Sequence, residues 1–159
     1  MTAPYAQTPV EVELTTDLNS KPYVDMTISI MKDFGVEIER NEYSSFTIHP
    51  SSFFPLSSYP IESDASAASY FFAAAAICGG TVRVEGLTTS SLQGDVGFVD
   101  ALEQMGARVE RGADHIAVTG GGQLQGVDVD FTDLSDTAQT LAVVAPFAAT
   151  PTTITGIGF

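Results

Sequence analysis

The sequence predicts an α/β fold in which βαβαββ units repeat along the chain around a core of buried helices. The first observation is the stretch DASAASYFFAAAAICGG, a predicted helix in which no charged side chain follows Asp64 until Arg83. A helix that is apolar on all sides is buried by its neighbours. The second observation is an internal repeat, in which Asp64 aligns with Asp136 and Gly86 with Gly158 at an offset of 72 residues. Self-similarity at a fixed period indicates copies of one supersecondary unit.

The first 50 residues are predicted to form the end of one unit. Its predicted elements are, in order, a strand at 10–14, a helix at 22–34 and strands at 36–39 and 45–49. The helix begins at Pro22, which suits the first turn of a helix, and it ends before Gly35, which suits a C-terminal cap.

One complete unit is predicted between about residues 57 and 119. Its predicted elements are a strand at 59–62, the buried helix at 65–78, a strand at 81–85, a helix at 94–105 and strands at 108–111 and 115–119. In the second helix, Phe98, Leu102 and Met105 form an apolar stripe at helical spacing, as one buried face requires. Gly106 follows this helix as Gly35 follows the helix of the preceding unit, at an offset of 71 residues.

Residues 126–159 are predicted to form the first half of a following unit, in which Asp136 caps an apolar helix as Asp64 caps helix 65–78. The chain is therefore expected to begin and end inside a repeat, as a piece of a longer protein truncated at both ends. In the central helix, alanine and serine allow close approach and Phe71 and Phe72 fill the remaining space. Cys78, a small residue at its end, is expected to be buried.

Composition excludes several classes of protein. The apolar run 65–78 is shorter than the roughly 20 residues of a membrane span, and the N-terminus lacks the pattern of a secretion signal, so a cytoplasmic protein without membrane association is expected. A net charge of -14, with only 6 Lys and Arg residues, argues against nucleic acid as a partner. An anionic ligand would have to be held by helix N-termini, whose N–H groups and dipole favour negative charge.

Four segments together resemble the EPSP synthase family of enolpyruvyl transferases. They are SKPYVDMTISIMKDFGVEI from Ser20, ESDASAASYFFAAAAICGGTVRVEGL from Glu62, SLQGDVGFVDALEQMGA from Ser91 and DVDFTDLSDTAQTLAVVAPFA from Asp128. The resemblance implies an inside-out α/β barrel fold, with two domains of three βαβαββ units each. Residues 1–61 would then belong to the last unit of the second domain. Residues 62–159 would hold one full and one partial unit of the other domain.

The resemblance also implies an activity. The family transfers the enolpyruvyl group of phosphoenolpyruvate to the 5-hydroxyl of shikimate 3-phosphate, on the pathway to chorismate and the aromatic amino acids, with no metal or organic cofactor. Both substrates are small anions, which agrees with helix N-termini as their hosts.

Three residues are implied as site residues by position. Ser20 matches the family's contact to the phosphate of shikimate 3-phosphate, and Tyr23 matches the residue that lies along the ring of that substrate. Asp136 matches the aspartate that hydrogen-bonds the 5-hydroxyl and transfers a proton. The alternative for Ser20 and for Asp136 is a simple helix N-cap, and Asp64 is expected to be structural. Ser63, Ser135 and Gln139 depart from the residues usual in the family.

Several groups of the family's site have no counterpart here, because its catalytic Lys-Glu-Thr-Asp-Arg motif would begin beyond Phe159 and its other phosphate-gripping Lys and Arg residues are missing. The chain alone is therefore expected to be inactive, and its cut repeat faces are expected to self-associate. Two alternatives are a piece of a UDP-N-acetylglucosamine enolpyruvyl transferase and a non-catalytic module of the same fold. His49 and His115 are isolated, with no second ligand at metal-site spacing.

Overall fold

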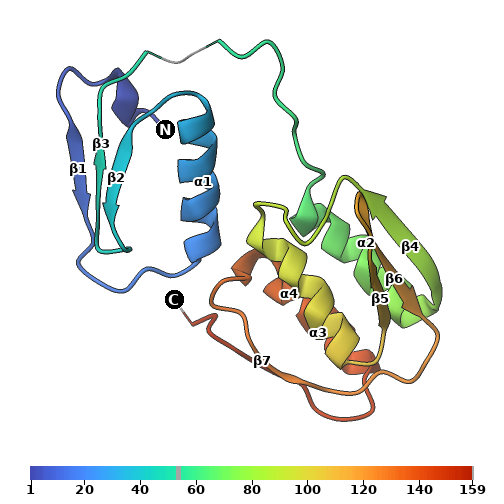
Figure 1. Cartoon of the computed structure of the whole chain (residues 1–159). Helices are drawn as coiled ribbons and strands as arrows, with labels where there is room; N and C mark the ends of the chain where they lie inside the picture. The colour runs from blue at the N-terminus through green and yellow to red at the C-terminus, as the bar shows by residue number, and fades with distance from the viewer. Residues whose placement is uncertain (53–54, 159) are drawn as a thin grey trace. The chain divides into compact units, whose positions relative to one another are not determined.

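The computed structural model describes residues 1–52 and 55–158 (Figure 1). The chain separates into two compact units, Met1–Pro60 and Ile61–Phe159. Phe159, the end of the predicted half-unit 126–159, lies outside the described residues. The predicted strand at 59–62 is wrong, because these residues form no regular element. Pro60 lacks the N–H that a strand ladder needs, and Ile61 is 90% exposed.

The first unit is a three-stranded antiparallel sheet with one helix packed on its face (Figure 1). Its elements are strand β1 (Val10–Glu13), helix α1 (Lys21–Asp33) and strands β2 (Ile38–Asn41) and β3 (Ser45–Ile48), after a short 3-10 turn at Ala3–Tyr5. β3 lies between β1 and β2. Ile28 and Met31 of α1 meet Phe46 and Ile48 of β3 in a small core.

The second unit holds the larger core and two sheets. Its elements are α2 (Ala65–Cys78), β4 (Gly80–Glu85), α3 (Phe98–Gln104), β5 (Arg108–Arg111), β6 (His115–Gly120), β7 (Asp128–Asp130), α4 (Ala138–Val144) and β8 (Thr153–Thr155). A 3-10 turn at Gly94–Gly97 leads into α3, and further 3-10 turns, Ser135–Thr137 and Ala145–Phe147, flank α4. β4, β6 and β5 form an antiparallel sheet in that order, while β7 and β8 pair in parallel.

The internal repeat is confirmed. The succession β1–α1–β2–β3 recurs as β4–α3–β5–β6, and in both copies the last strand lies in the centre of the sheet. Gly35 and Gly106 end the two helices with φ of 82° and 106°, a region in which glycine bears no steric cost. The predicted apolar stripe of α3 is also confirmed, since Leu102 and Met105 are 0% exposed.

Helix α2 forms the centre of the second unit, but the prediction that it is buried on all sides is wrong for this chain. Ala68, Phe72 and Ala76 lie in the core, whereas Tyr70 and Phe71 are 55% and 61% exposed. Cys78 is exposed as well, which corrects the expectation that it is buried. The exposed side chains share one face of α2, and the described elements leave that face uncovered.

The end of β6 packs closely against α2. A Cβ atom at Gly120 would lie 2.0 Å from the carbonyl oxygen of Ala75, so only glycine fits at this contact. Within the described ranges, no helix is both long enough and apolar enough to cross a membrane.

Candidate functional site

The start of α1 carries the first two predicted site residues, Ser20 and Tyr23. Ser20 occupies the N-cap position with φ 56° and ψ 44°, in the left-handed region. A side-chain cap needs an extended backbone, and within residues 1–52 and 55–158 the Ser20 side chain makes no capping hydrogen bond to α1. Ser20 therefore stands at the cap position without capping, and Tyr23 follows one turn later, its N–H bonded to the Ser20 carbonyl at 3.2 Å.

A left-handed serine is itself informative. This conformation costs an L-residue roughly 1–2 kcal/mol, and it persists only when the surrounding structure holds it. Pro22, the second residue of α1, fixes its own φ and favours helix initiation directly after Ser20. The chain thus turns sharply into α1 and presents residue 20 at the positive end of the helix dipole.

A cavity of about 420 Å³ opens beside this helix start. It is lined by Leu14, Thr15, Thr16, Asp17, Leu18, Lys21, Glu42, Tyr43 and Ser44. Lys21 brings a positive charge into a mostly polar lining, and its Nζ lies 5.2 Å from the centre of the Tyr43 ring. Asp17 and Glu42 oppose an anion in the same cavity, so the helix dipole and Lys21 have to outweigh them.

A polar network supports one wall of this cavity. Tyr43 donates a hydrogen bond from its hydroxyl to Asp25 at 2.5 Å, and Arg40 forms an ion pair with the other oxygen of Asp25. The hydrogen bond to the Asp25 carboxylate raises the pKa of Tyr43 and so keeps the phenol protonated. Lys21 lines this cavity, whereas Arg40 is not among the lining residues, so Lys21 is the cation that a ligand in the cavity would meet.

The start of α2 is satisfied internally, in contrast to that of α1. Asp64 has an extended backbone, and its carboxylate accepts a hydrogen bond from the N–H of Ala67 at 2.8 Å. The N–H of Ala65 donates to the side-chain oxygen of Gln93, also at 2.8 Å. The structural role predicted for Asp64 is confirmed.

Asp136 differs from Asp64, and the prediction that both cap their helices in the same way is wrong. Asp136 lies inside the 3-10 turn Ser135–Thr137 that precedes α4, so it is not the N-cap residue. It is exposed, and among the described residues its carboxylate makes no hydrogen bond or ion pair. Its backbone carbonyl accepts a hydrogen bond from the Gln139 side chain at 2.6 Å. The carboxylate of Asp136 is thus not used by the fold.

The structure brings Ser20 and Tyr23 together on the first turn of α1, and it places Asp136 in the other unit. Gln93 is a residue of the second unit that was not predicted from the sequence to have a special position. Its side chain joins the start of α2 to the loop before α3, and only the SLQGD motif hinted at a special position there.

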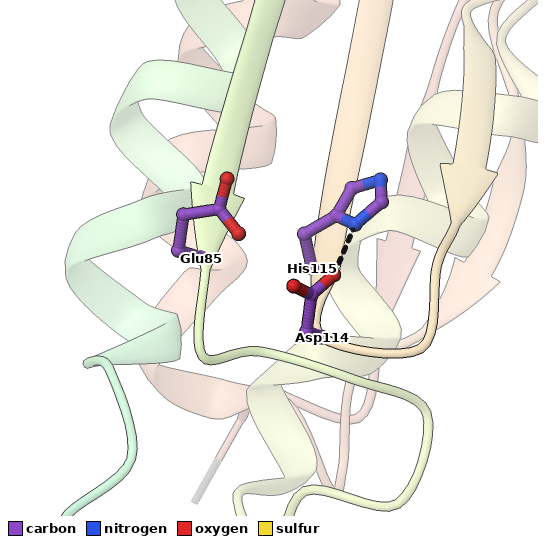
Figure 2. A group of neighbouring side chains, drawn as sticks. All are labelled: Glu85, Asp114 and His115. Atoms are coloured by element: carbon purple, nitrogen blue, oxygen red, sulfur yellow. Dashed lines mark hydrogen bonds and ion pairs between the residues drawn. The ribbon is translucent and has the colours of Figure 1, made fainter.

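Another feature is a histidine with two carboxylates, shown in Figure 2. Glu85 ends β4, His115 lies opposite it at the start of β6, and Asp114 precedes His115 in the turn. Potential ligand atoms of these residues all lie within 4.8 Å of one another. The prediction that His115 is isolated is therefore wrong, because strand register brings Glu85 to it from 30 residues away.

Ion pairs account for this group of residues. Arg83 contacts Glu85 at 2.6 Å and Asp114 at 3.6 Å, and its single positive charge offsets part of the charge of the two carboxylates. His115 contacts Asp114 at 2.8 Å and Glu110 at 3.3 Å. The hydrogen bond to Asp114 raises the pKa of His115, and the same bond lowers the pKa of Asp114. A metal ion would have to replace the ion pairs of Arg83 and the hydrogen bonds of His115, so the group acts as a local charge network.

Comparison with known proteins extends these observations. The model of one protein family, EPSP synthase (3-phosphoshikimate 1-carboxyvinyltransferase), matches residues 1–159. Among curated relatives, a 3-phosphoshikimate 1-carboxyvinyltransferase of Nostoc sp. is 47% identical over 157 residues, and one of Yersinia pestis is 47% identical over 158. Each match covers 99% of this chain and 37% of the relative, so the chain spans little more than a third of their length.

Solved structures agree on the fold. An EPSP synthase from Acinetobacter baumannii matches with a TM-score of 0.72 and 23% identity, covering 97% of this chain and 36% of the other. The enolpyruvyl transferase NikO from Streptomyces tendae matches with a TM-score of 0.70 and 21% identity, covering 96% and 36%. The repeated α/β units described above are thus those of the enolpyruvyl transferase fold.

Proposed function

This chain belongs to the EPSP synthase family, and on that premise we propose that it forms part of an enzyme that makes 5-enolpyruvylshikimate 3-phosphate. The enzyme would transfer the enolpyruvyl group of phosphoenolpyruvate to the 5-hydroxyl of shikimate 3-phosphate, in the cytoplasm, on the route to the aromatic amino acids. The observation that carries the proposal is the identity of 47% with 3-phosphoshikimate 1-carboxyvinyltransferases along 99% of the chain.

Ser20 and Tyr23 are proposed to hold shikimate 3-phosphate. Support comes from the start of α1, where the left-handed Ser20 stands at the positive end of the helix and Lys21 adds a positive charge to the adjoining cavity. The phosphate would meet Ser20, and the ring of the substrate would lie along Tyr23. An overall charge of -14 makes such a local positive potential necessary for binding an anion.

Asp136 is proposed to accept the proton of the 5-hydroxyl. In the overall reaction the hydroxyl oxygen forms a bond to C2 of phosphoenolpyruvate, the C2–O bond to phosphate breaks, and the hydroxyl proton has to leave. An exposed carboxylate that the fold does not use as a helix cap is suited to take that proton. Phosphoenolpyruvate itself would be held mainly by residues outside this chain.

The proposal includes the place of the chain in the whole enzyme. Residues 1–61 would belong to the last repeat unit of one domain, and residues 62–159 to one full and one partial unit of the other. The chain alone would be inactive, because it lacks most of the groups that bind phosphoenolpyruvate.

Genetic complementation tests the activity. The complete reading frame that contains this chain should restore growth without aromatic amino acids to a bacterial strain that lacks EPSP synthase. The frame carrying Asp136→Asn should fail, while Asp64→Asn should succeed. A complete frame that ends at codon 159, or that restores only a strain lacking the UDP-N-acetylglucosamine enolpyruvyl transferase, would refute the proposal.

Self-association is proposed for the 159-residue chain itself. Tyr70 and Phe71 of α2 and Val143 and Phe147 at α4 are each more than half exposed, on two helices that pack together and carry no charged residue. Exposed apolar side chains on such helices favour association. Analytical ultracentrifugation at several concentrations would measure it, and a monomer at every concentration would refute it.

A further inference from the structure

The turn that carries Asp136 is held on its buried side, although the side chain of Asp136 itself is exposed. Asp136 is the middle residue of the 3-10 turn Ser135–Thr137, directly before α4. Thr137 is 0% exposed, and its N–H and its hydroxyl both donate to the carbonyl of Leu134, at 3.0 Å and 2.9 Å. The residue after Asp136 is therefore fixed by two hydrogen bonds within the turn.

A pair of buried hydroxyl groups joins α4 to α2. Thr140, in the first turn of α4, is 5% exposed, and its Oγ1 lies 3.1 Å from the Oγ of Ser69, which is 0% exposed. Ser69 has one hydroxyl proton, which it donates to the carbonyl of Ser66 at 2.6 Å. Thr140 is therefore the donor to Ser69. The two hydrogen bonds run in one direction from α4 to the backbone of α2, and in such a chain each bond strengthens the other.

The rest of the contact between these helices is apolar. Ala138, Leu141 and Val144 of α4 belong to the same core as Ala68 and Phe72 of α2. Apolar burial has no preferred direction, so it leaves α4 several similar positions along α2. A hydrogen bond requires a narrow range of distance and angle, and a buried hydroxyl without a partner is costly. The hydroxyl pair therefore selects one position of α4 on α2.

The position of α4 determines where Asp136 lies. Thr140 follows Asp136 by four residues, about one helical turn, and the turn Ser135–Thr137 packs against α2 together with α4. The bonds of Thr137 make the turn follow any shift of α4. A general base has to lie within about 2.6–3.2 Å of the proton that it takes. A misplacement of about 1 Å can lower the rate by about 10²-fold.

We propose that Thr140 and Ser69 are positioning residues for Asp136, through the hydrogen bond that fixes α4 on α2. This inference rests on the proton-transfer role proposed above for Asp136. Both hydroxyl groups are buried in the second unit, so they act on the reaction only through the place that they give to the Asp136 carboxylate.

The first test needs no reaction and uses the 159-residue chain. Thr140→Val removes the donor to Ser69 with little change of shape, so amide hydrogen exchange at Thr137 should become faster by about tenfold or more in NMR measurements. Exchange at Ala107, whose N–H is bonded to the carbonyl of Leu102, reports global opening and should stay unchanged. Thr140→Ser keeps the hydroxyl and should keep slow exchange at Thr137. Equal exchange at Thr137 in Thr140→Val and in the unmodified chain would overturn the proposal.

The second test measures catalysis by the complete enzyme. Thr140→Val and Ser69→Ala should each lower kcat by about 10–100-fold with little change in the KM for shikimate 3-phosphate, because the misplaced group acts in the transition state. Thr140→Ser should retain most of kcat. Val144→Ala removes buried packing at the other end of α4 but keeps the hydroxyl pair, so it should lower Tm and retain kcat. A loss of kcat in Val144→Ala as large as in Thr140→Val would reduce the hydroxyl pair to a contribution to stability.

The third test asks whether the effect passes through Asp136. Once Asp136→Asn has removed the base, adding Thr140→Val should lower kcat by less than about twofold further. The same fold-loss from Thr140→Val with and without the Asp136 carboxylate would overturn this inference alone, as would full kcat in Thr140→Val beside a large loss in Asp136→Asn. Full kcat in Asp136→Asn would instead overturn the proposed role of Asp136, and this inference with it.

Discussion

Asp64 and Asp136 stand at equivalent positions of the repeat, but only Asp64 caps a helix in the structure. In Asp64→Ala, helix α2 loses a cap hydrogen bond of 2.8 Å. Loss of such a cap costs about 1 kcal/mol, within a range of about 0.5–2 kcal/mol. In a unit of about a hundred residues, 1 kcal/mol lowers Tm by roughly 4–8 °C. In Asp136→Ala no side-chain bond within the described part of the chain is lost, so the free energy of unfolding should change by less than about 0.5 kcal/mol.

Urea unfolding of the chain, followed by circular dichroism, measures both variants under one condition, and equal m-values would show that only stability has changed. The second arm uses the complete enzyme. There Asp136→Asn should lower kcat by about 10²–10⁴-fold at nearly unchanged Tm, the usual contribution of a general base. Asp64→Asn should keep kcat, since asparagine caps a helix about as well as aspartate.

Two results would refute this reasoning. Equal losses of stability in Asp64→Ala and Asp136→Ala would show that Asp136 also caps its helix in solution. Equal and small losses of kcat in the two asparagine variants would leave Asp136 without a catalytic role, whatever its effect on stability.

Three further predictions concern the charge network, the core and the exposed face. Because the pKa of His115 is raised in the folded protein, its ion pair with Asp114 stabilises the fold fully below the unfolded pKa of about 6.5, and this stabilisation is lost as the pH rises through the folded pKa. Because the pKa of Asp114 is lowered, the same stabilisation is also lost in acid, as the pH falls through the folded pKa of Asp114. Stability measured between pH 5 and pH 8 should therefore fall across the histidine titration, and His115→Gln should abolish that step. Gly120→Ala should destabilise the second unit by more than about 3 kcal/mol in urea unfolding, because the added methyl group would lie 2.0 Å from the backbone of Ala75. A loss of stability below about 1 kcal/mol would contradict this close packing. Phe71→Ser should weaken the self-association of the chain in ultracentrifugation without lowering its stability, since that side chain is 61% exposed.

Local signals in the sequence determined much of the fold. The limits of α2 were predicted to the residue, because Asp64 caps its start and Gly79, with φ of 81°, ends it. The strand at 108–111 was predicted with its observed limits for a related reason, since Gly106 ends α3 directly before it. At these two elements the cap and the glycines were sufficient to predict the limits, whereas the cap predicted at Asp136 does not form.

Long-range contacts account for what the sequence did not reveal. Glu85 meets His115 only through the register of β4 and β6, and Gln93 reaches Ala65 across 28 residues. The exposure of Cys78 depends on which helices are present to cover α2, which local pattern cannot decide. Of the candidate site, the helix start at Ser20 was predictable from its sequence, but its left-handed backbone was not.

The starts of α1 and α2 differ in whether a side chain caps the first turn of the helix. At α2, Asp64 and Gln93 satisfy the N–H groups of the first turn, so that start serves the fold. At α1, Ser20 holds the same position in a conformation that does not cap. Ser20→Asp would place a carboxylate there, which would favour the helix by about 0.3–1 kcal/mol through its dipole while repelling an incoming phosphate. Calorimetry on the complete enzyme should then show weaker binding of shikimate 3-phosphate together with an equal or higher Tm. Unchanged binding in Ser20→Asp would mean that the phosphate lies elsewhere, and that the start of α1 serves only to turn the chain.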